Sequence, residues 1–563
     1  MAKTKTKPIA TVDILTLDYQ LAELPSSQHR AGLAGLVLLV QWLERQPEFQ
    51  DRVNQGAICQ IIRLDDRGAT LELNQAGVEA LFDEIYAASV EEQERAQPLK
   101  NKQKEIIPPL REEERQETDD KGKQKTKKVY IYPVVIPRGS FLVDPSYDQS
   151  SDGKNGHWVK LWRDMVWQIL RGVPATRKPF EARSEGKYAE DAVNVWKQLI
   201  QPAEFTVDLP STYYLGAQAN NAENVPFKDR ARFQFLLHFW LFAAQIYVPA
   251  VVDNEGKRNF VGYALAIPDV AYLQWFCEEI PGILSDRSPE LSGYRPRDAI
   301  VDLAVESALD LMKRLRDRLT QTTGEQSISS TVFGIDVIHT EKQGNNIRVL
   351  SVTRLDPEEA MLDGYAQIRG HYWSPLFRRQ CLLNLVNHQP WYTGFDALLC
   401  TLPYEQSIEN DYFRRDVREK LKALVEEENQ MDEITTTNSS TSNNSASVEL
   451  MVFRLVSNYV NRKLKTKYDL EWKAEWKGLK NDELNQRAEY KKYAEMKAKV
   501  AKSAFLDIRS RTEQMDFVNY FVSSLCSVPQ HMKSEDFVDL TKALYQETDK
   551  IRTLTLLALS ANS

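Results

Sequence analysis

The chain has 563 residues, of which 42% are hydrophobic and 27% charged, and its formal net charge is −8. This composition is ordinary for a folded protein of roughly three to four domains and excludes an intrinsically disordered chain. The five cysteines are widely scattered and form no CxxC pair, which excludes a zinc ribbon and a disulfide scaffold and fits a reducing cytosol. Because the bulk charge is acidic, any nucleic-acid site must be a local basic patch.

The first segment, residues 1–99, reads as α+β. Its basic N-terminus lacks the apolar core of a secretory signal. The run ATVDILTLDY predicts a strand, and AGLAGLVLLVQWLE, apolar nearly all round, predicts a core helix that Ser26 or Ser27 can cap. The run QIIRLDDRGATLEL (60–73) predicts a hairpin that turns at residues 66–68.

Two breaks in composition divide the rest of the chain. Residues 100–128 hold 17 charged residues in 29, which predicts a charged linker. The run TTTNSSTSNNSAS (435–447) predicts a flexible polar linker. We therefore predict five parts: an N-terminal α+β segment (1–99), a charged linker (100–128), an α+β main body (129–430), a polar linker (431–447) and a helical bundle (448–563).

The main body interleaves hairpins with long helices. The runs IYVPAVVDNEGKRNFVGYALAIPDV and TVFGIDVIHTEKQGNNIRVLSVTRLDP predict hairpins that turn near residues 254–256 and 344–346, and residues 298–320 predict a helix. This pattern favours antiparallel sheets over βαβ units. The predicted fold class is therefore α+β: a mixed multi-domain body with antiparallel sheets and long helices, followed by a C-terminal all-α helical bundle.

An uncharged stretch, residues 233–252, is long enough to span a membrane. It contains Gln234, His238, Gln245 and Pro249 and becomes β-rich at its end. We predict a buried helix that runs into a strand, and a soluble, cytoplasmic protein without membrane contact.

No motif in the sequence identifies a catalyst. The phosphate loop GxxxxGK[ST], the GxSxG elbow and the HExxH zinc motif are all absent, and no two histidines have metal-ligand spacing. Asp336 and Asp356 end or follow strands, where a divalent ion can in principle be held, but such carboxylates also serve as turn and strand-edge residues. The sequence predicts no cofactor and no resident metal. The absence of catalytic motifs favours a binding protein over an enzyme.

Two segments of the main body are candidates for nucleic-acid contact. A Pro-punctuated loop after a Trp-rich helix places cations for phosphate oxygens, or carries ordinary surface charges: Arg171, Arg177, Lys178 and Arg183. The stretch YYLGAQANNAENVPFKDRAR (213–232) combines amides that can contact base edges with a basic run, although asparagines also serve turn geometry. Its candidates are Gln218, Asn220, Asn221 and Asn224, followed by Lys228 and Arg230.

The last segment concentrates positive charge. Residues 451–511 carry 16 Lys and Arg against 8 Asp and Glu, interleaved with Tyr459, Tyr468, Trp472, Trp476 and Tyr493. Basic surfaces with aromatic neighbours suit single-stranded nucleic acid, whereas the alternative is a solvated helix face with the tryptophans in the core. The candidate cations are Arg462, Lys463, Lys465, Lys467, Lys473, Lys477, Lys491, Lys492, Arg509 and Arg511.

Several blocks taken in order resemble the large subunit of a type I CRISPR surveillance complex (Cascade), most closely the type I-B variant. They are LAELPSSQHRAGLAGLVLLVQWL (21–43), HWVKLWRDMVWQILRGVPATRKPF (157–180), YYLGAQANNAENVPF (213–227), FVGYALAIPDVAYLQWF (260–276) and VFGIDVIHTEKQGNNIRVLSVTRLDP (332–357).

The resemblance implies a binding subunit that is not an enzyme. Its implied partners are the 5′ handle of the guide RNA (crRNA), double-stranded target DNA, the backbone, handle-binding and small subunits of Cascade, and a helicase-nuclease effector or transposition proteins. Such a subunit recognises the protospacer-adjacent motif (PAM), helps to open the duplex and stabilises the R-loop. The resemblance implies that the amide loop reads the motif and that 448–563, similar to the small subunit, contacts the displaced strand. The cations of 171–183, together with Lys228 and Arg230, are predicted to contact nucleic-acid backbone. A separate small subunit could start at Met431 or Met451.

Two alternatives stay open. The first is a metal-dependent nuclease that uses Asp336 or Asp356. The second is a scaffold protein that makes no nucleic-acid contact and whose basic face docks an acidic partner.

Overall fold

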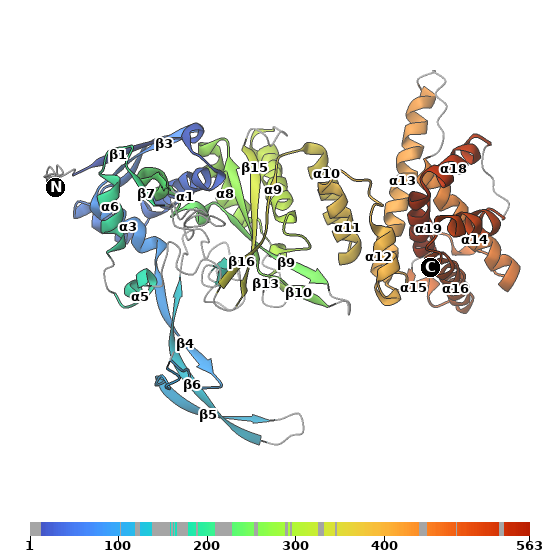
Figure 1. The fold of residues 1–563 in the computed structure, drawn as a ribbon, viewed down its shortest axis with the longest axis horizontal. Coiled ribbons are helices and arrows are strands. Elements are labelled where there is room, and N and C mark those ends of the chain that lie inside the picture. Colours follow the sequence, from blue (N-terminus) through green and yellow to red (C-terminus); the bar gives the residue numbers. More distant parts are fainter. Residues whose placement is uncertain are drawn as a thin grey trace, which may run out of the picture. The chain divides into compact units, whose positions relative to one another are not determined.

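A computed structural model describes residues 13–101, 103–118, 124–137, 158, 161–162, 164–165, 178–186, 190–208, 228–252, 257–287, 291–292, 295–324, 331–343, 346–437, 447–479, 481–527 and 534–563 (Figure 1). The chain divides into two compact units, which we describe separately. Unit 1 comprises residues 1–250 and 260–359, and unit 2 comprises residues 251–259 and 360–563.

Unit 1 begins with a small antiparallel sheet in the order β1-β3-β2, formed by β1 (Leu15–Gln20), β2 (Cys59–Asp65) and β3 (Gly68–Leu73). The predicted hairpin of residues 60–73 is confirmed. Its turn is stabilised by the Asp65 carboxylate, which accepts hydrogen bonds from the backbone N–H groups of Arg67 and Gly68 at 2.8 and 3.0 Å. Local hydrogen bonding by an aspartate is the usual reason for its place at a turn.

The core helix predicted after Ser26 is α1 (Ser27–Leu43), and Ser26 is its N-cap. The helix is buried nearly all round, as its apolar sequence requires. Gly32 and Gly35 let another backbone segment approach closely, because a Cβ atom at these positions would lie 2.3 Å from the carbonyl oxygen of Leu236 and 2.0 Å from that of Phe239. Helix α1 therefore packs backbone against backbone on the segment that leads into the main sheet.

That segment confirms the prediction of buried helical structure followed by a strand. Helix α7 (Ala231–Leu236) and the 3₁₀ turn η3 (Trp240–Phe242) precede β9 (Gln245–Val252). Burial lowers the pKa of His238 to about 3, so this histidine is a neutral core residue at physiological pH. Within the described ranges, no helix is both long and apolar enough to cross a bilayer.

The main sheet has the order β10-β9-β11-β15-β16, and β14 pairs with β9. Its further strands are β10 (Arg258–Phe260), β11 (Tyr263–Val270), β14 (Ile300–Val301), β15 (Val332–Gln343) and β16 (Asn346–Leu355). The antiparallel pairs β9–β11 and β15–β16 confirm both predicted hairpins, whose turn residues 254–256 and 344–345 lie outside the described residues.

Helices α8 (Leu273–Ser285) and α9 (Glu306–Thr323) follow the sheet strands in the chain. The predicted helix over residues 298–320 begins only at Glu306, because residues 300–301 pair with β9 as β14. Unit 1 also contains α2 (Pro47–Asn54), α3 (Gln75–Ile85), α5 (Lys178–Ser184), α6 (Asp191–Leu199), β7 (Thr206–Asp208), β8 (Lys228–Arg230), β12 (Leu291–Ser292) and β13 (Arg295–Pro296).

The segment 100–128, for which the sequence predicts a linker, contributes strands to a charged ribbon. Strands β4 (Ala88–Arg95), β5 (Arg111–Thr118) and β6 (Gln124–Pro137) form an antiparallel sheet in the order β4-β6-β5, drawn in blue to teal in Figure 1. Its charges pair across strands: Arg111 with Glu92, Arg115 with Glu94, and Lys128 with Glu112. The high charge density of residues 100–128 indicates a solvent-exposed segment, which the sequence analysis interprets as a linker. Ion pairs between strands allow such an exposed segment to form a sheet instead.

Unit 2 is helical. Its helices are α10 (Glu359–His371), α11 (Pro375–Val386), α12 (Phe395–Thr401), α13 (Asp411–Thr437), α14 (Val448–Tyr468), α15 (Asn481–Leu484), α16 (Ala488–Arg509), α17 (Gln514–Tyr520), α18 (Ser534–Gln546) and α19 (Thr548–Asn562). Helix α19 is buried nearly all round, and α12, α13, α14 and α16 pack against it.

Unit 2 begins near residue 360, inside the predicted main body of 129–430. Helix α13 continues to Thr437 and so enters the predicted polar linker of 431–447, of which residues 438–446 lie outside the described residues. Antiparallel sheets in unit 1 and helices in unit 2 confirm the predicted α+β class.

Candidate nucleic-acid interface

Most of the cations and amides predicted to contact nucleic acid in the main body lie outside the described residues: Arg171, Arg177, Gln218, Asn220, Asn221 and Asn224. Lys178 begins helix α5, and its side chain is not described. The roles proposed for these residues stay predictions.

Arg183 is described and is engaged within the protein. Its side chain is 8% exposed, and its guanidinium pairs with Asp83 at 2.8 Å and with Asp191 at 3.1 Å. It also lies 5.0 Å from the centre of the Tyr86 ring. In this conformation two carboxylates neutralise the guanidinium, so a contact with phosphate requires Arg183 to exchange partners. Its role as a backbone contact stays a prediction.

Lys228 and Arg230 lie on β8 and are exposed. The guanidinium of Arg230 pairs with Glu204 at 3.2 Å and lies 5.2 Å from the centre of the Phe233 ring. The Glu204 side chain is 77% exposed, so this pair is weak and can dissociate readily. Both cations can therefore reach an approaching phosphate.

The basic residues of α14 to α16 form the most extended set of exposed cations predicted from the sequence. Eight of the ten predicted cations are exposed: Arg462, Lys463, Lys465, Lys467, Lys473, Lys477, Lys491 and Lys492. Lys465 and Lys473 pair with Glu471 and Glu489, whereas the structure describes no ion pair for the other six. An exposed cation without a carboxylate partner can neutralise a phosphate without first giving up an ion pair.

Arg509 and Arg511 are only half-exposed and contact groups of their own unit. Arg509 donates to the carbonyl oxygen of Cys400 at 2.7 Å and lies 4.7 Å from the Tyr404 ring centre. Arg511 lies 4.3 Å from the Tyr520 ring centre. These contacts favour a packing role for both side chains.

The aromatic residues between these cations separate into one exposed ring and a core. Trp476 and Tyr493 are buried and form a cluster with Leu464 and Leu484. Trp472 is 51% exposed, and its ring packs edge-on against Trp476 at a centroid distance of 5.6 Å. Of the two tryptophans that the sequence singles out, only Trp472 can stack on a base.

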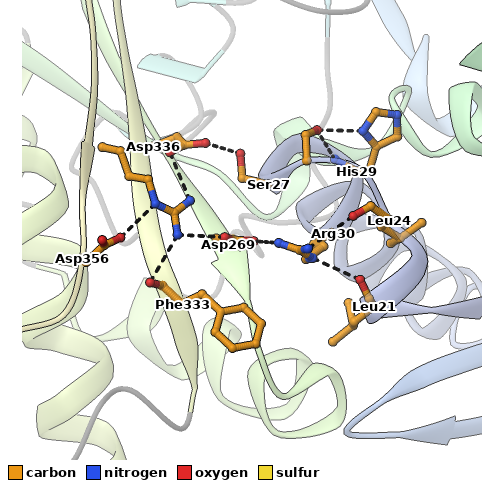
Figure 2. Close-up of polar contacts among 11 residues, drawn as sticks. Leu21, Leu24, Ser27, His29, Arg30, Asp269, Phe333, Asp336 and Asp356 are labelled. Carbon is orange, nitrogen blue, oxygen red and sulfur yellow. Dashed lines mark hydrogen bonds and ion pairs between the residues drawn. The ribbon is translucent and has the colours of Figure 1, made fainter.

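Asp336 and Asp356, the two carboxylates considered as metal ligands, belong to a cluster of ion pairs (Figure 2). The Arg354 guanidinium lies between them, with Nε 2.8 Å from Asp356 and Nη1 3.5 Å from Asp336. Asp336 also accepts a hydrogen bond from the Ser27 hydroxyl. A cation already occupies the space between the carboxylates, and no group of three metal-ligating side chains occurs among the described residues. The arrangement therefore favours ion pairing over metal binding.

The centre of this cluster is Asp269, which sequence analysis did not single out. It is 4% exposed and lies between two guanidinium groups, 2.5 Å from Arg30 and 2.9 Å from Arg354. Partial burial opposes the charged form of Arg354, but hydrogen bonds to Asp269 and Asp356 raise its pKa. A carboxylate inside the apolar run YALAIPDV was the available signal, because a buried charge requires a partner.

The fold and the site together define a class: a multi-domain α+β protein whose second unit is helical and exposes cations on and between α14 and α16. Comparison with family models then assigns the chain to a family. The type I-B CRISPR Cas8b N-terminal domain matches residues 58–325, and the type I-B CRISPR Cas8b C-terminal domain matches residues 332–562. The chain therefore belongs to the Cas8b family and is a type I-B CRISPR large subunit, as the resemblance predicted. No curated protein matches the chain.

Proposed function

We propose that this large subunit recognises the motif that flanks the DNA target, assists duplex opening and stabilises the displaced strand, within a complex that carries the guide RNA. The match to both Cas8b domains carries the proposal, and the exposed cations of α14 to α16 support it. Its proposed partners are the guide 5′ handle, the other Cascade subunits, and a helicase-nuclease or transposition proteins.

The physical logic agrees with this division of labour. Guide–target pairing reads the sequence, so the protein needs only to read a short motif and neutralise backbone. Exchange of the DNA duplex for a heteroduplex is nearly balanced in free energy, so modest stabilisation of the displaced strand is sufficient to favour opening. The acidic charge of residues outside the basic surface discourages DNA binding elsewhere.

The motif-reading role is tested with the assembled complex. Asn221→Ala is expected to weaken binding to duplex DNA that carries the motif and to spare a target that is already opened, because only the closed duplex depends on motif reading. Binding of both targets is measured by gel shift at one salt concentration. Equal losses on both targets would remove the motif-reading role of this loop.

The basic surface is tested through salt dependence. A single strand that places about five phosphates on the surface gives a slope of log affinity against log salt of about −3.5. In the full chain, the double substitution Lys463→Gln and Lys467→Gln is expected to reduce that slope by about 1.4, because two phosphate contacts are lost. The control is Lys104→Gln with Lys542→Gln, which changes the net charge equally at exposed positions elsewhere. An equal reduction in the control would show that net charge, and no particular surface, determines binding.

A further inference from the structure

The turn between α10 and α11 exposes a large aromatic side chain. Trp373, which lies in this turn, is 60% exposed. Elements α10, α11 and α13, which build this part of unit 2, are labelled in Figure 1. Exposure of a tryptophan to this degree loses the hydrophobic stabilisation that burial of the ring provides. Isolated exposed apolar residues are common, so the surroundings of Trp373 decide what the exposure means.

The backbone at Trp373 is fixed by a buried carboxylate. Asp416 on α13 accepts hydrogen bonds from the backbone N–H groups of Trp373 and Ser374 at 2.8 and 2.6 Å, both to Oδ2. Ser374 in turn caps α11 by accepting a hydrogen bond from the N–H of Phe377. Asp416 is fully buried, and its Oδ1 finds no hydrogen-bond partner among the described residues. The turn thus holds Trp373 in place at the cost of a partly unsatisfied carboxylate.

The neighbouring side chains are aromatic and cationic. The exposed Arg415 places its guanidinium carbon 5.3 Å from the centre of the Trp373 ring. Tyr412, 58% exposed, precedes Arg415 by three residues and so lies on the same side of α13. Residues 364–380 contain three arginines and no Asp or Glu, whereas the chain as a whole has a net charge of −8.

We propose that Trp373 and Arg415 form a second contact for single-stranded nucleic acid, in which a base stacks on the part of the Trp373 ring that Arg415 leaves exposed and the guanidinium binds an adjacent phosphate. Base–aromatic stacking combined with a nearby arginine is the usual chemistry of single-strand sites. The inference rests on the proposed function, in that the chain contacts nucleic acid, and adds a site on α10 to α13 that is separate in sequence from the basic surface of α14 to α16.

Tryptophan, tyrosine and arginine are also common at the centres of protein–protein interfaces. The local positive charge of residues 364–380, which contain arginines but no Asp or Glu, favours a polyanion such as nucleic acid. An exposed ring on a hydrogen-bonded turn suits stacking in particular, since the entropy of ordering the backbone of the turn is already lost in the folded protein.

The test measures binding of the full chain to a labelled oligothymidine and to an abasic strand of equal length by fluorescence anisotropy. Trp373→Ala is expected to raise the Kd for oligothymidine roughly 5- to 100-fold, as expected for one lost stacking contact, and to leave the abasic strand unaffected. Trp373→Phe should restore most of the affinity. Arg415→Ala should reduce the salt slope by about 0.7 for both strands. The control is Tyr545→Ala, an equally exposed aromatic residue on α18.

Three results would overturn the proposal. The first is unchanged oligothymidine binding by Trp373→Ala. The second is an equal loss on both strands, which indicates a structural role. The third is that Trp373→Ala binds both oligonucleotides normally but no longer assembles with the other subunits of its complex. That result would identify Trp373 as a protein contact. If the unmodified chain ignores oligothymidine, the proposed displaced-strand function fails as well. If the Lys463 and Lys467 substitutions weaken oligothymidine binding but Trp373→Ala does not, the proposed displaced-strand function stands and the proposed Trp373 site fails.

Discussion

Asp269→Ala is expected to destabilise unit 1 by about 3 kcal/mol, the largest effect that we expect from a single polar substitution. The carboxylate is buried between Arg30 and Arg354, so its loss leaves two guanidinium groups without the anion between them, and Arg30 loses its carboxylate partner while Arg354 keeps Asp336 and Asp356. Arg354 is 41% exposed and can regain water, whereas Arg30 is 21% exposed and keeps the carbonyl oxygens of Leu21 and Leu24 and the Phe333 ring as partners, none of which carries a negative charge. Urea unfolding followed by fluorescence measures the change.

The matched control is Asp356→Ala. Asp356 binds the same Arg354 guanidinium but is 72% exposed, so its removal is expected to change the free energy of unfolding by no more than about 0.5 kcal/mol. Similar losses for both variants would show that burial does not determine the strength of these ion pairs. Neither variant is expected to alter a response to metal ions, because Asp269 and Asp356 both pair with Arg354.

Gly35→Ala is expected to destabilise unit 1 by about 2 kcal/mol, although alanine favours a helix over glycine by about 1 kcal/mol. The added Cβ would lie 2.0 Å from the carbonyl oxygen of Phe239, and backbone cannot move aside as a flexible side chain can. Hydrogen exchange of the amides in α1 and η3 reports the local loss of stability.

Gly370→Ala is the control, for which we expect a change in stability of the opposite sign. Gly370 lies in α10, and a Cβ there would meet nothing within 4 Å. The substitution is expected to stabilise the helix by about 0.5–1 kcal/mol through backbone entropy alone. If Gly35→Ala and Gly370→Ala both reduced the protection of backbone amides against hydrogen exchange, the steric explanation for Gly35 would be contradicted.

Much of the fold follows from local patterns. The apolar run after Ser26, the Asp-Arg-Gly turn and the two long hairpins all appear as predicted, because periodicity and turn chemistry act over a few residues. The charged ribbon of β4 to β6 could not be predicted from charge density, since the strands become stable through pairs such as Arg111 with Glu92, which join residues distant in sequence.

The candidate site divides in the same way. The concentration of lysines in residues 451–511 predicts that they face solvent, and Lys463 and Lys491 are exposed in the structure. Sequence cannot distinguish Trp472 from Trp476, because which ring is buried depends on the fold of α14 against α16. Trp373 was missed because its significance depends on Asp416 and Arg415, more than forty residues away in the chain.

The packing of α19 has a consequence for the hypothesis that a separate small subunit starts at Met451 or Met431. Helix α19 is covered in part by α12 and α13, and Arg418 on α13 donates to the carbonyl oxygen of Ala561 at 2.9 Å. A polypeptide that begins at Met451 lacks both helices, and one that begins at Met431 keeps only the last turns of α13. Such a product would leave one side of its most apolar helix uncovered, and would remain soluble only by burying that side against another protein.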